Sequence, residues 1–295
     1  MTRVTRCCPS DLVCRAGRAA AGLDYTRRLE RHPLQLTGAN RIRYIPAEPS
    51  PARRIGRATS RDGRRSVVSV EQELRQQIVE IGRRIYDRFF VAANDGNISA
   101  RLPDGSILVT PTGVSKGTMS PLDLILVTPE GKVLEAAPGR RPSSETPMHL
   151  AAYRLRPDVN AVVHAHPPVA TGFAIAGEAL DAPILPEIVL TVGSIPLVPY
   201  GTPAGVDLQN VVEPFIPTHD ALLLANHGAV TFGEDLTRAF FRMESLELYA
   251  RVLLVTRLLG ARRDLSPEEI GALLSLRAKS GARGMNTFER DTRAK

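Results

Sequence analysis

Residues 161–168, with the sequence AVVHAHPP, occupy the middle of the folding pattern in this chain of 295 residues. The alternation over residues 161–166 predicts a short β-strand. Residues i and i+2 of a strand project from the same face, so His164 and His166 would lie side by side. This pair could hold a divalent ion such as zinc, although two histidines at this spacing also occur without any metal.

Short strand-like runs and helical patterns alternate on both sides of this strand. Leu74, Ile78, Ile81, Ile85 and Phe89 recur at helical spacing and predict one face of a helix. Further strands are predicted at residues 97–101, 106–110, 122–128, 184–192, 195–200 and 221–225. Further helices are predicted at residues 143–156, 206–215, 234–259 and 267–276, with Gly260 as a C-cap.

The connections between many of these strands are too short for parallel crossovers. We therefore predict an α/β fold, a three-layer α/β/α sandwich on a mixed, largely antiparallel central sheet. The content of 43% apolar and 23% charged residues agrees with such a globular fold and excludes a wholly disordered or fibrous chain.

Composition divides the chain into an Arg-rich N-terminal extension, a folded domain and a polar tail, at residues 1–66, 67–280 and 281–295. The first 65 residues carry 15 arginines and five acidic residues, a net charge of +10. The remainder carries 23 basic and 26 acidic residues, a net charge of −3. The domain therefore has no basic field with which to bind nucleic acid.

The extension has too few apolar residues to fold, and we predict that it is disordered. A transit peptide and a nucleic-acid-binding arm are the functional alternatives. The scattered acids and prolines favour an extension without a folded role, or translation that begins near residues 67–70.

The sequence also indicates a compartment. No stretch approaches the about 18 uninterrupted apolar residues that a membrane helix needs, so we expect no membrane association. All three cysteines (Cys7, Cys8 and Cys14) lie in the extension, so the domain has neither a disulfide nor a thiolate metal site. We expect the protein to act in the reducing cytoplasm.

A third histidine, His227, follows the predicted strand at residues 221–225 and precedes Gly228. At the end of a strand it could be a third metal ligand or a histidine whose role is structural. Three histidines without a fourth strong ligand are typical of a catalytic zinc site with an open position.

The run Ser143-Ser144-Glu145-Thr146-Pro147 has the composition of a helix start. As a capping motif, it would satisfy the first free N–H groups and place an acid where it favours the helix dipole. Alternatively, the helix start binds an anion through Ser143 and Ser144, and Glu145 faces the metal as a carboxylate base.

Two glycine-containing loops, at residues 94–101 and 110–117, offer backbone N–H groups beside hydroxyl, amide or ammonium donors. Such loops bind phosphate, but they are also ordinary turns, and neither has the spacing of a nucleotide-binding fingerprint.

Together these segments resemble the class II (zinc-dependent) aldolase/adducin family over about residues 70–260. The matching motifs occur in the family's order and at its separations: GNISAR, TPTGVSKG, PSSETPMH, VVHAHPP and LLANHGAVTFG. The resemblance implies an α/β/α sandwich assembled as a homotetramer, with the active site at a subunit boundary and a phosphorylated sugar as substrate.

The resemblance also implies roles for individual residues. One Zn²⁺ per subunit would be bound by His164, His166 and His227. Glu145 would be the catalytic acid/base and a further zinc ligand when substrate is absent. The phosphate would be bound by Asn97, Thr112, Gly113, Ser143 and Ser144.

The implied reaction is aldol cleavage of a phosphorylated ketose to dihydroxyacetone phosphate and an aldehyde, through a zinc-stabilised enediolate. One departure concerns a tyrosine that transfers a proton at the leaving aldehyde oxygen in the family's aldolases. The corresponding stretch, residues 185–188, reads LPEI, and only Glu187 or Tyr200 would be available as substitutes.

Other reactions on the same zinc site therefore stay open, namely dehydration or decarboxylation of a sugar phosphate. A sugar-phosphate 4-epimerase would usually carry aspartate in place of Glu145. A non-catalytic adducin-like binding module would lack the metal site.

We predict that the N-terminal extension is dispensable. A chain that begins at Val67 should keep the metal content and the melting temperature of the full chain, because the first helical pattern begins near Ser69. Thermal unfolding and metal analysis of both proteins provide the check. A large drop in melting temperature, or loss of solubility, would show that the extension packs on the domain.

Overall fold

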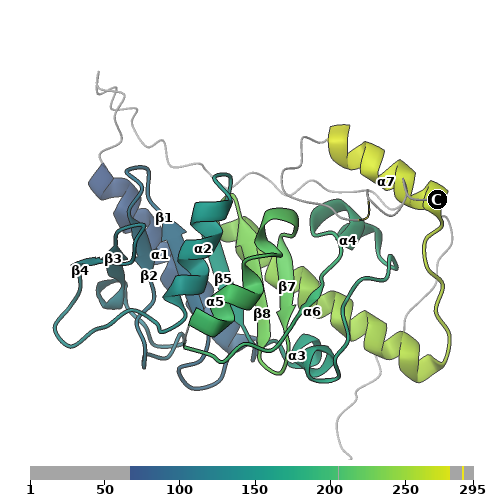
Figure 1. Cartoon of the computed structure of the whole chain (residues 1–295), viewed down its shortest axis with the longest axis horizontal. Helices are drawn as coiled ribbons and strands as arrows, with labels where there is room; N and C mark the ends of the chain where they lie inside the picture. The colour runs from purple at the N-terminus through teal and green to yellow at the C-terminus, as the bar shows by residue number, and fades with distance from the viewer. Residues whose placement is uncertain (1–66, 205, 280–287, 289–295) are drawn as a thin grey trace, which may run out of the picture. The chain divides into compact units, whose positions relative to one another are not determined.

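The computed structural model describes residues 67–204, 206–279 and 288, which form an eight-stranded sheet flanked by helices (Figure 1). The strands are β1 (Asn97–Arg101), β2 (Ile107–Val109), β3 (Ile125–Val127), β4 (Val133–Glu135), β5 (Ala161–Ala165), β6 (Leu197–Val198), β7 (Ala221–Leu224) and β8 (Gly228–Gly233). Their order in the sheet is β4-β3-β2-β1-β5-β8-β7-β6. Every neighbouring pair is antiparallel except β6 with β7. The predicted mixed, largely antiparallel sheet is confirmed.

Helices cover both faces of this sheet. They are α1 (Val67–Asp87), α2 (Thr146–Leu155), α3 (Pro168–Ile175), α4 (Pro186–Thr191), α5 (Val206–Val212), α6 (Leu236–Leu259) and α7 (Pro267–Lys279), with 3₁₀ turns at Pro121–Asp123 and Ile216–Thr218. One apolar core lies between the sheet and α2 and α5, and the other lies between the sheet and α1, α3 and α6. This arrangement is the predicted three-layer sandwich.

The centre of the sheet is β5, which pairs with β1 on one side and β8 on the other. All its residues are buried, and they alternate between the two cores. Val163 packs on the α1 and α6 side, whereas Val162 packs on the α2 side. His164 therefore faces α2, the same side as Val162.

The strong helical pattern at residues 234–259 correctly predicted a helix, α6. Helix α6 begins after Asp235, whose carboxylate accepts a hydrogen bond of 2.7 Å from the Arg238 N–H, and it ends at Gly260 with a left-handed φ of 69°. Glycine adopts this conformation without strain, so the predicted C-cap is confirmed.

The predicted strand at residues 184–192 is wrong, because this segment forms helix α4. Pro186 fixes the backbone of its first turn, and Ile188 and Val189 are buried. A short apolar run fits a strand and a buried helix equally well, so its pattern could not decide between them.

The end of α1 also differs from the prediction. The helix stops at Asp87, and Phe89 takes a left-handed φ of 59° with 80% of its surface exposed. The next residue, Phe90, is the one that enters the core. Strands β4 and β8 and helix α3 were not predicted. The predicted strand at 195–200 pairs in the sheet at Leu197–Val198 and forms an isolated bridge between Ile195 and Leu180.

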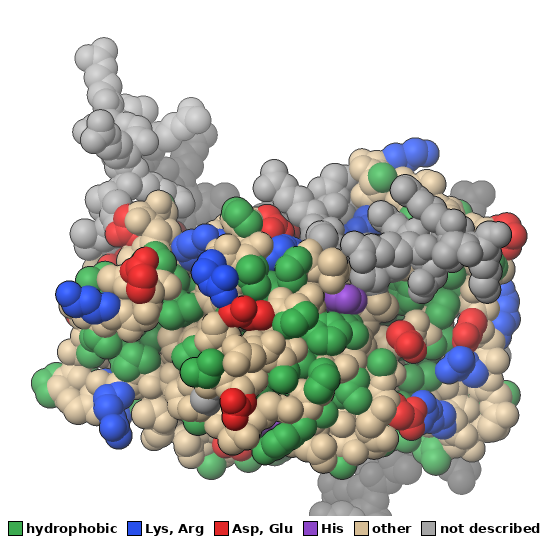
Figure 2. All heavy atoms as spheres, viewed as in Figure 1, with side chains coloured by type: hydrophobic (Ala, Val, Ile, Leu, Met, Phe, Trp, Pro, Cys, Tyr) green, Lys and Arg blue, Asp and Glu red, His purple; other side chains and the backbone are tan. Residues whose placement is uncertain are grey.

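The surface of the described residues carries charges of both signs. On the face shown in Figure 2, acidic and basic side chains are interspersed, without a large basic area. None of the described helices has both the length and the apolarity to cross a membrane. The predicted extension of residues 1–66 and the predicted tail, apart from the buried Phe288, lie outside the described residues.

A buried ion-pair cluster at the start of β7 joins elements from both faces of the sheet. Asp220, at the start of β7, is fully buried and lies 2.9 Å from the Arg156 guanidinium and 3.2 Å from that of Arg242. Arg156 follows α2, and Arg242 belongs to α6. Removal of the carboxylate would leave two buried cations without their shared partner.

We predict that Asp220→Ala costs about 3–5 kcal/mol of unfolding free energy, since the carboxylates that Arg156 and Arg242 would keep, Asp158 and Glu234, are more exposed than Asp220. Arg263→Ala is the matched control, because its ion pair with Glu269 is exposed and should contribute almost nothing. Urea unfolding of both variants measures the difference. Equal losses would show that the Asp220 cluster does not hold these elements together.

Candidate metal centre

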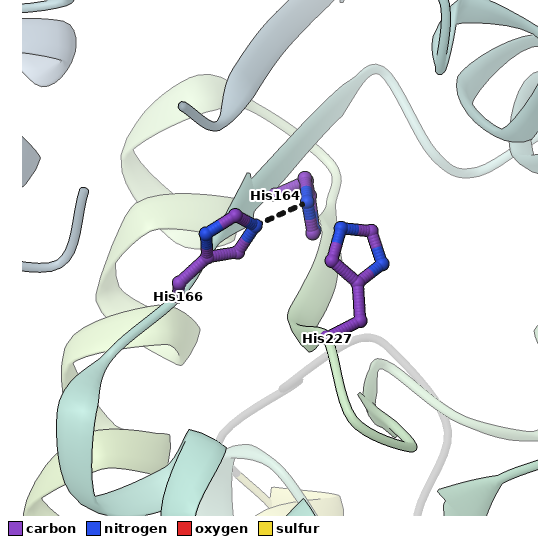
Figure 3. A group of neighbouring side chains, drawn as sticks. All are labelled: His164, His166 and His227. Carbon is purple, nitrogen blue, oxygen red and sulfur yellow. Dashed lines mark hydrogen bonds between the residues drawn. The ribbon is translucent and has the colours of Figure 1, made fainter. Parts of the chain in front are cut away.

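Three imidazoles converge at one end of the central strands (Figure 3). His164 lies on β5, His166 directly follows it, and His227 lies in the turn between β7 and β8. Their ring centroids are 4.7–5.0 Å apart, and one ring nitrogen of each lies within 4.8 Å of the others. The structure therefore brings together the three histidines that the sequence analysis singled out.

The turn before β8 sets this geometry. Asn226 adopts a left-handed φ of 56°, and the N–H of His227 donates to the carbonyl of Leu224 at 3.0 Å. Gly228 follows, where a Cβ atom would lie 2.6 Å from both the Ala165 carbonyl oxygen and the His166 ring. Only glycine lets the turn approach β5 this closely, so Gly228 holds His227 beside His166.

The hydrogen bonds of His164 define which nitrogen faces the cluster. Its Nδ1 donates to the carbonyl of Ala229 at 2.9 Å, which leaves Nε2 with a lone pair. That Nε2 lies 3.2 Å from the Nε2 of His166 and 3.2 Å from the Glu145 carboxylate. The His166 nitrogen lies within hydrogen-bond distance of this lone pair, whereas the lone pair and the Glu145 carboxylate repel each other unless they share a cation or a proton.

The charge states follow from burial. Burial lowers the pKa of both His164 and His166 to about 4, and the neighbouring His227 imidazole lowers the pKa of both further. Both are neutral at pH 7, which is the form that donates to a metal. The Nδ1 of His227 is buried without a hydrogen-bond partner among the described residues, so it places no constraint on the Nε2 that faces Glu145.

Glu145 occupies the N-cap position of α2 without capping it. Its side chain accepts no hydrogen bond from the helix backbone. Instead, its two oxygens lie 3.2 Å from His164 and His227, and one accepts a 2.7 Å hydrogen bond from the Asn97 amide. Burial alone would raise the pKa of Glu145, but the imidazoles and the Asn97 amide outweigh it and hold the pKa well below its usual range. The geometry therefore favours the metal-facing carboxylate over the capping interpretation.

The residues expected to bind phosphate lie on two adjoining segments. The N–H of Thr112 donates to the carbonyl of Arg141 at 3.0 Å, and the N–H of Ser143 donates to the carbonyl of Thr110 at 3.1 Å. These bonds align the loop that contains Thr112 and Gly113 with the approach to α2 at Ser143 and Ser144. Asn97 lies on β1, opposite His164 in the sheet.

The same loop is anchored by a buried lysine that the sequence analysis did not single out. Lys116 is 1% exposed, and its ammonium donates to the carbonyls of Asn94 and Val114 at 2.9 and 2.8 Å. Burial lowers its pKa to about 8. It joins the two glycine-containing loops, at residues 94–101 and 110–117, to each other.

The two proposed substitutes for the family's tyrosine are both exposed. Glu187 lies in the first turn of α4, and Tyr200 follows β6 with 58% of its surface exposed. A set of buried polar residues was missed by the sequence analysis, namely Ser99, His149 and Tyr153. Their spacing was a usable signal, since His149 and Tyr153 follow Glu145 at intervals of four on α2.

Comparisons with known proteins agree with this geometry. Residues 76–254 match the family described as Class II Aldolase and Adducin N-terminal domain. The 3-oxo-tetronate 4-phosphate decarboxylase of Escherichia coli strain CFT073 is 38% identical over 213 residues, which cover 70% of this chain and 97% of that protein. The L-fuculose phosphate aldolase of Methanococcus maripaludis is 34% identical over 177 residues, which cover 60% of this chain and 93% of that protein.

A solved structure supports the same relationship. The crystal structure of YgbL from Klebsiella pneumoniae matches with a TM-score of 0.64 and 33% identity, over 69% of this chain and 98% of that one. The family match includes all eight strands and every residue of the site. The chain therefore belongs to the class II aldolase and adducin family.

Proposed function

We propose that this protein is a metal-dependent decarboxylase of a phosphorylated 3-oxo sugar acid, with 3-oxo-tetronate 4-phosphate as the expected substrate. Loss of CO₂ from this acid and protonation of the remaining carbon would give dihydroxyacetone phosphate. The relative that carries this activity is 38% identical over nearly its whole length. Decarboxylation is one of the alternatives that the sequence left open.

The missing tyrosine supports decarboxylation over aldol cleavage. When an aldolase cleaves its ketose, the hydroxyl that becomes the aldehyde must lose a proton, and a second acid/base group must accept it. A substrate carboxylate is already ionised and leaves as CO₂ without any proton transfer. The proposed reaction therefore needs only one acid/base residue, and Glu145 is the one in the centre of the site.

The donor set fits a divalent metal ion. Neutral imidazoles of His164, His166 and His227 would hold it, together with Glu145 when substrate is absent, and nitrogen ligands without thiolate favour zinc. The lone pairs of His164 and Glu145, which face each other at 3.2 Å, would then share a cation. Such an ion supplies Lewis-acid stabilisation of the negative charge that develops on the substrate oxygens.

Glu145 would protonate the carbon that has lost CO₂. In the structure its pKa is low because of the imidazoles of His164 and His227 and the Asn97 amide, in opposition to burial. A ligand that separates Glu145 from the two imidazoles removes much of what lowers its pKa. Burial then raises the pKa, and the carboxylate can take up the proton that it delivers.

The phosphate of the substrate would lie where two segments meet at the start of α2. Backbone N–H groups at a helix N-terminus favour an anion, and the hydroxyls of Ser143 and Ser144 add donors. Thr112 and Gly113 lie on the adjoining loop, and the Asn97 amide would connect this subsite to Glu145. The homotetramer and the cytoplasmic location stay predictions from the resemblance and the composition.

Aldol cleavage is the second candidate function. It is favoured by the L-fuculose phosphate aldolase that is 34% identical over 60% of the chain. Both reactions leave the same carbanion next to the same carbonyl, so only the departing group distinguishes them.

Zinc content tests the metal centre. His164→Ala, His166→Ala and His227→Ala should each reduce bound zinc from about one per chain to a small fraction, because only Glu145 could compensate for a lost imidazole. His219→Ala, which removes a histidine outside the cluster, should keep its zinc. Elemental analysis of the purified variants gives the result. Full occupancy in any of the three ligand variants would exclude that histidine as a ligand.

The reaction itself is tested with 3-oxo-tetronate 4-phosphate. Wild type should release CO₂ and dihydroxyacetone phosphate in equal amounts, with one solvent deuterium fixed at the new C–H when the reaction runs in D₂O. Glu145→Gln should lower kcat by about 10²- to 10⁴-fold, the usual contribution of a positioned general acid, while bound zinc stays near one per chain.

Glu187→Gln and Tyr200→Phe are the matched controls, because decarboxylation requires no second proton donor. Both should keep kcat within about twofold of wild type. A large loss in either variant would contradict the single-acid mechanism. If the protein cleaved a phosphorylated ketose and released no CO₂ from the 3-oxo acid, its function would be aldol cleavage instead.

A further inference from the structure

A continuous line of buried hydrogen bonds leads away from Glu145 into the protein. Glu145 is bonded to Asn97 (2.7 Å), Asn97 to His149 (2.5 Å), His149 to Ser99 (2.7 Å) and Ser99 to Tyr153 (2.6 Å). All five residues are at most 9% exposed. Burial of this many polar groups costs free energy unless each of them makes its hydrogen bonds.

The line exists because a helix face meets a strand face. Glu145, His149 and Tyr153 recur at intervals of four and lie on the same side of α2. Asn97 and Ser99 recur at an interval of two and lie on the same side of β1. The two rows interlock, so each bond crosses from the helix to the strand.

Glu145, the first residue of the line, determines which group donates in each of the four bonds. An ionised carboxylate only accepts, so the Asn97 amide nitrogen faces Glu145 and the amide oxygen faces His149. The Nε2 of His149 must then carry the proton. Burial lowers the pKa of His149 to about 4, so the ring is neutral and its Nδ1 accepts. Ser99 donates to that Nδ1, and the Tyr153 hydroxyl donates to Ser99.

We propose that His149 is a positioning residue for the reaction, which acts by holding the Asn97 amide in the orientation that donates to Glu145. This proposal rests on the proposed role of Glu145 as the acid. If the amide turned over, its oxygen would face the carboxylate, and two acceptors would repel each other. The Nε2–H of His149 excludes that orientation, and Ser99 and Tyr153 fix the tautomer of His149.

The line does not transfer protons to Glu145. An amide has no proton that it releases near neutral pH, so Asn97 interrupts any relay between His149 and the carboxylate. The role of the line is orientation. Glu145 is held by Asn97 on one side, which leaves its imidazole-facing oxygens directed at the centre of the site.

Two substitutions of His149 separate positioning from packing. The glutamine amide nitrogen reaches about the place of the imidazole Nε2, so His149→Gln keeps a donor for Asn97. The shorter asparagine reaches only the place of Nδ1, so His149→Asn loses that donor. We expect His149→Asn to lower kcat by about 10- to 100-fold with KM and bound zinc nearly unchanged, and His149→Gln to keep kcat within about threefold.

Two further variants control for stability. Tyr249→Phe removes another buried hydroxyl, which donates to the Ala182 carbonyl outside the line, and should leave kcat unchanged. Ser99→Ala removes the donor to His149 Nδ1 and should lower kcat by less than His149→Asn, so it tests the line even if both His149 variants fail to fold. Equal loss of kcat in His149→Gln and His149→Asn, or loss in Tyr249→Phe of the same size, would overturn the proposal.

A spectroscopic readout is independent of turnover. ¹⁵N NMR of the zinc-loaded full chain should show His149 as the neutral tautomer protonated at Nε2, with Nδ1 unprotonated. The Nδ1–H tautomer, or a doubly protonated ring at pH 7, would overturn the proposed direction of the bonds. If wild type lacked decarboxylase activity, this measurement would still decide the state of His149, so failure of the proposed function and failure of the line are distinguishable.

Discussion

The antiparallel pairing of β5 with its two neighbours is the interaction on which the site depends. Its register places His164 opposite Asn97 on β1 and opposite Val230 on β8. Because side chains alternate across a strand, a slip of one residue would turn His164 toward α6 and away from Glu145. The backbone hydrogen bonds of the sheet therefore determine whether the His164 imidazole lies close to the Glu145 carboxylate.

That placement creates an electrostatic constraint inside the protein. A buried carboxylate is unfavourable without a partner, and the neutral His164 imidazole, which turns a lone pair toward it, does not provide one. The Asn97 amide satisfies one lone pair of Glu145, and a metal ion on the imidazoles would supply the missing positive charge. The close approach of β8 to β5 at Gly228 makes this cluster compact enough to hold a single ion.

The sequence predicted those parts in which one pattern determines the structure. The shared face of His164 and His166 and helix α6 follow from periodicity, the Gly260 cap follows from the residue type, and the sandwich follows from the short connections between strands. Helix α4 was missed because a short apolar run fits either a strand or a helix. Strand β8 was also missed. His149 was read only as the end of a motif, since its role depends on the packing of α2 against β1, about 50 residues away.

The proposed reaction is harder to infer from the sequence than the metal centre is, for a chemical reason. Decarboxylation and aldol cleavage both leave a carbanion beside a carbonyl, so both need the same phosphate site, the same metal ligands and the same acid. All of the motifs that carry the family resemblance serve these shared requirements. The two reactions differ only in whether the departing group needs a proton transfer. The informative feature is therefore a missing tyrosine. In this family's aldolases the segment that corresponds to residues around Glu187 carries the second acid/base, but here it has no tyrosine. A departing CO₂ requires no such residue.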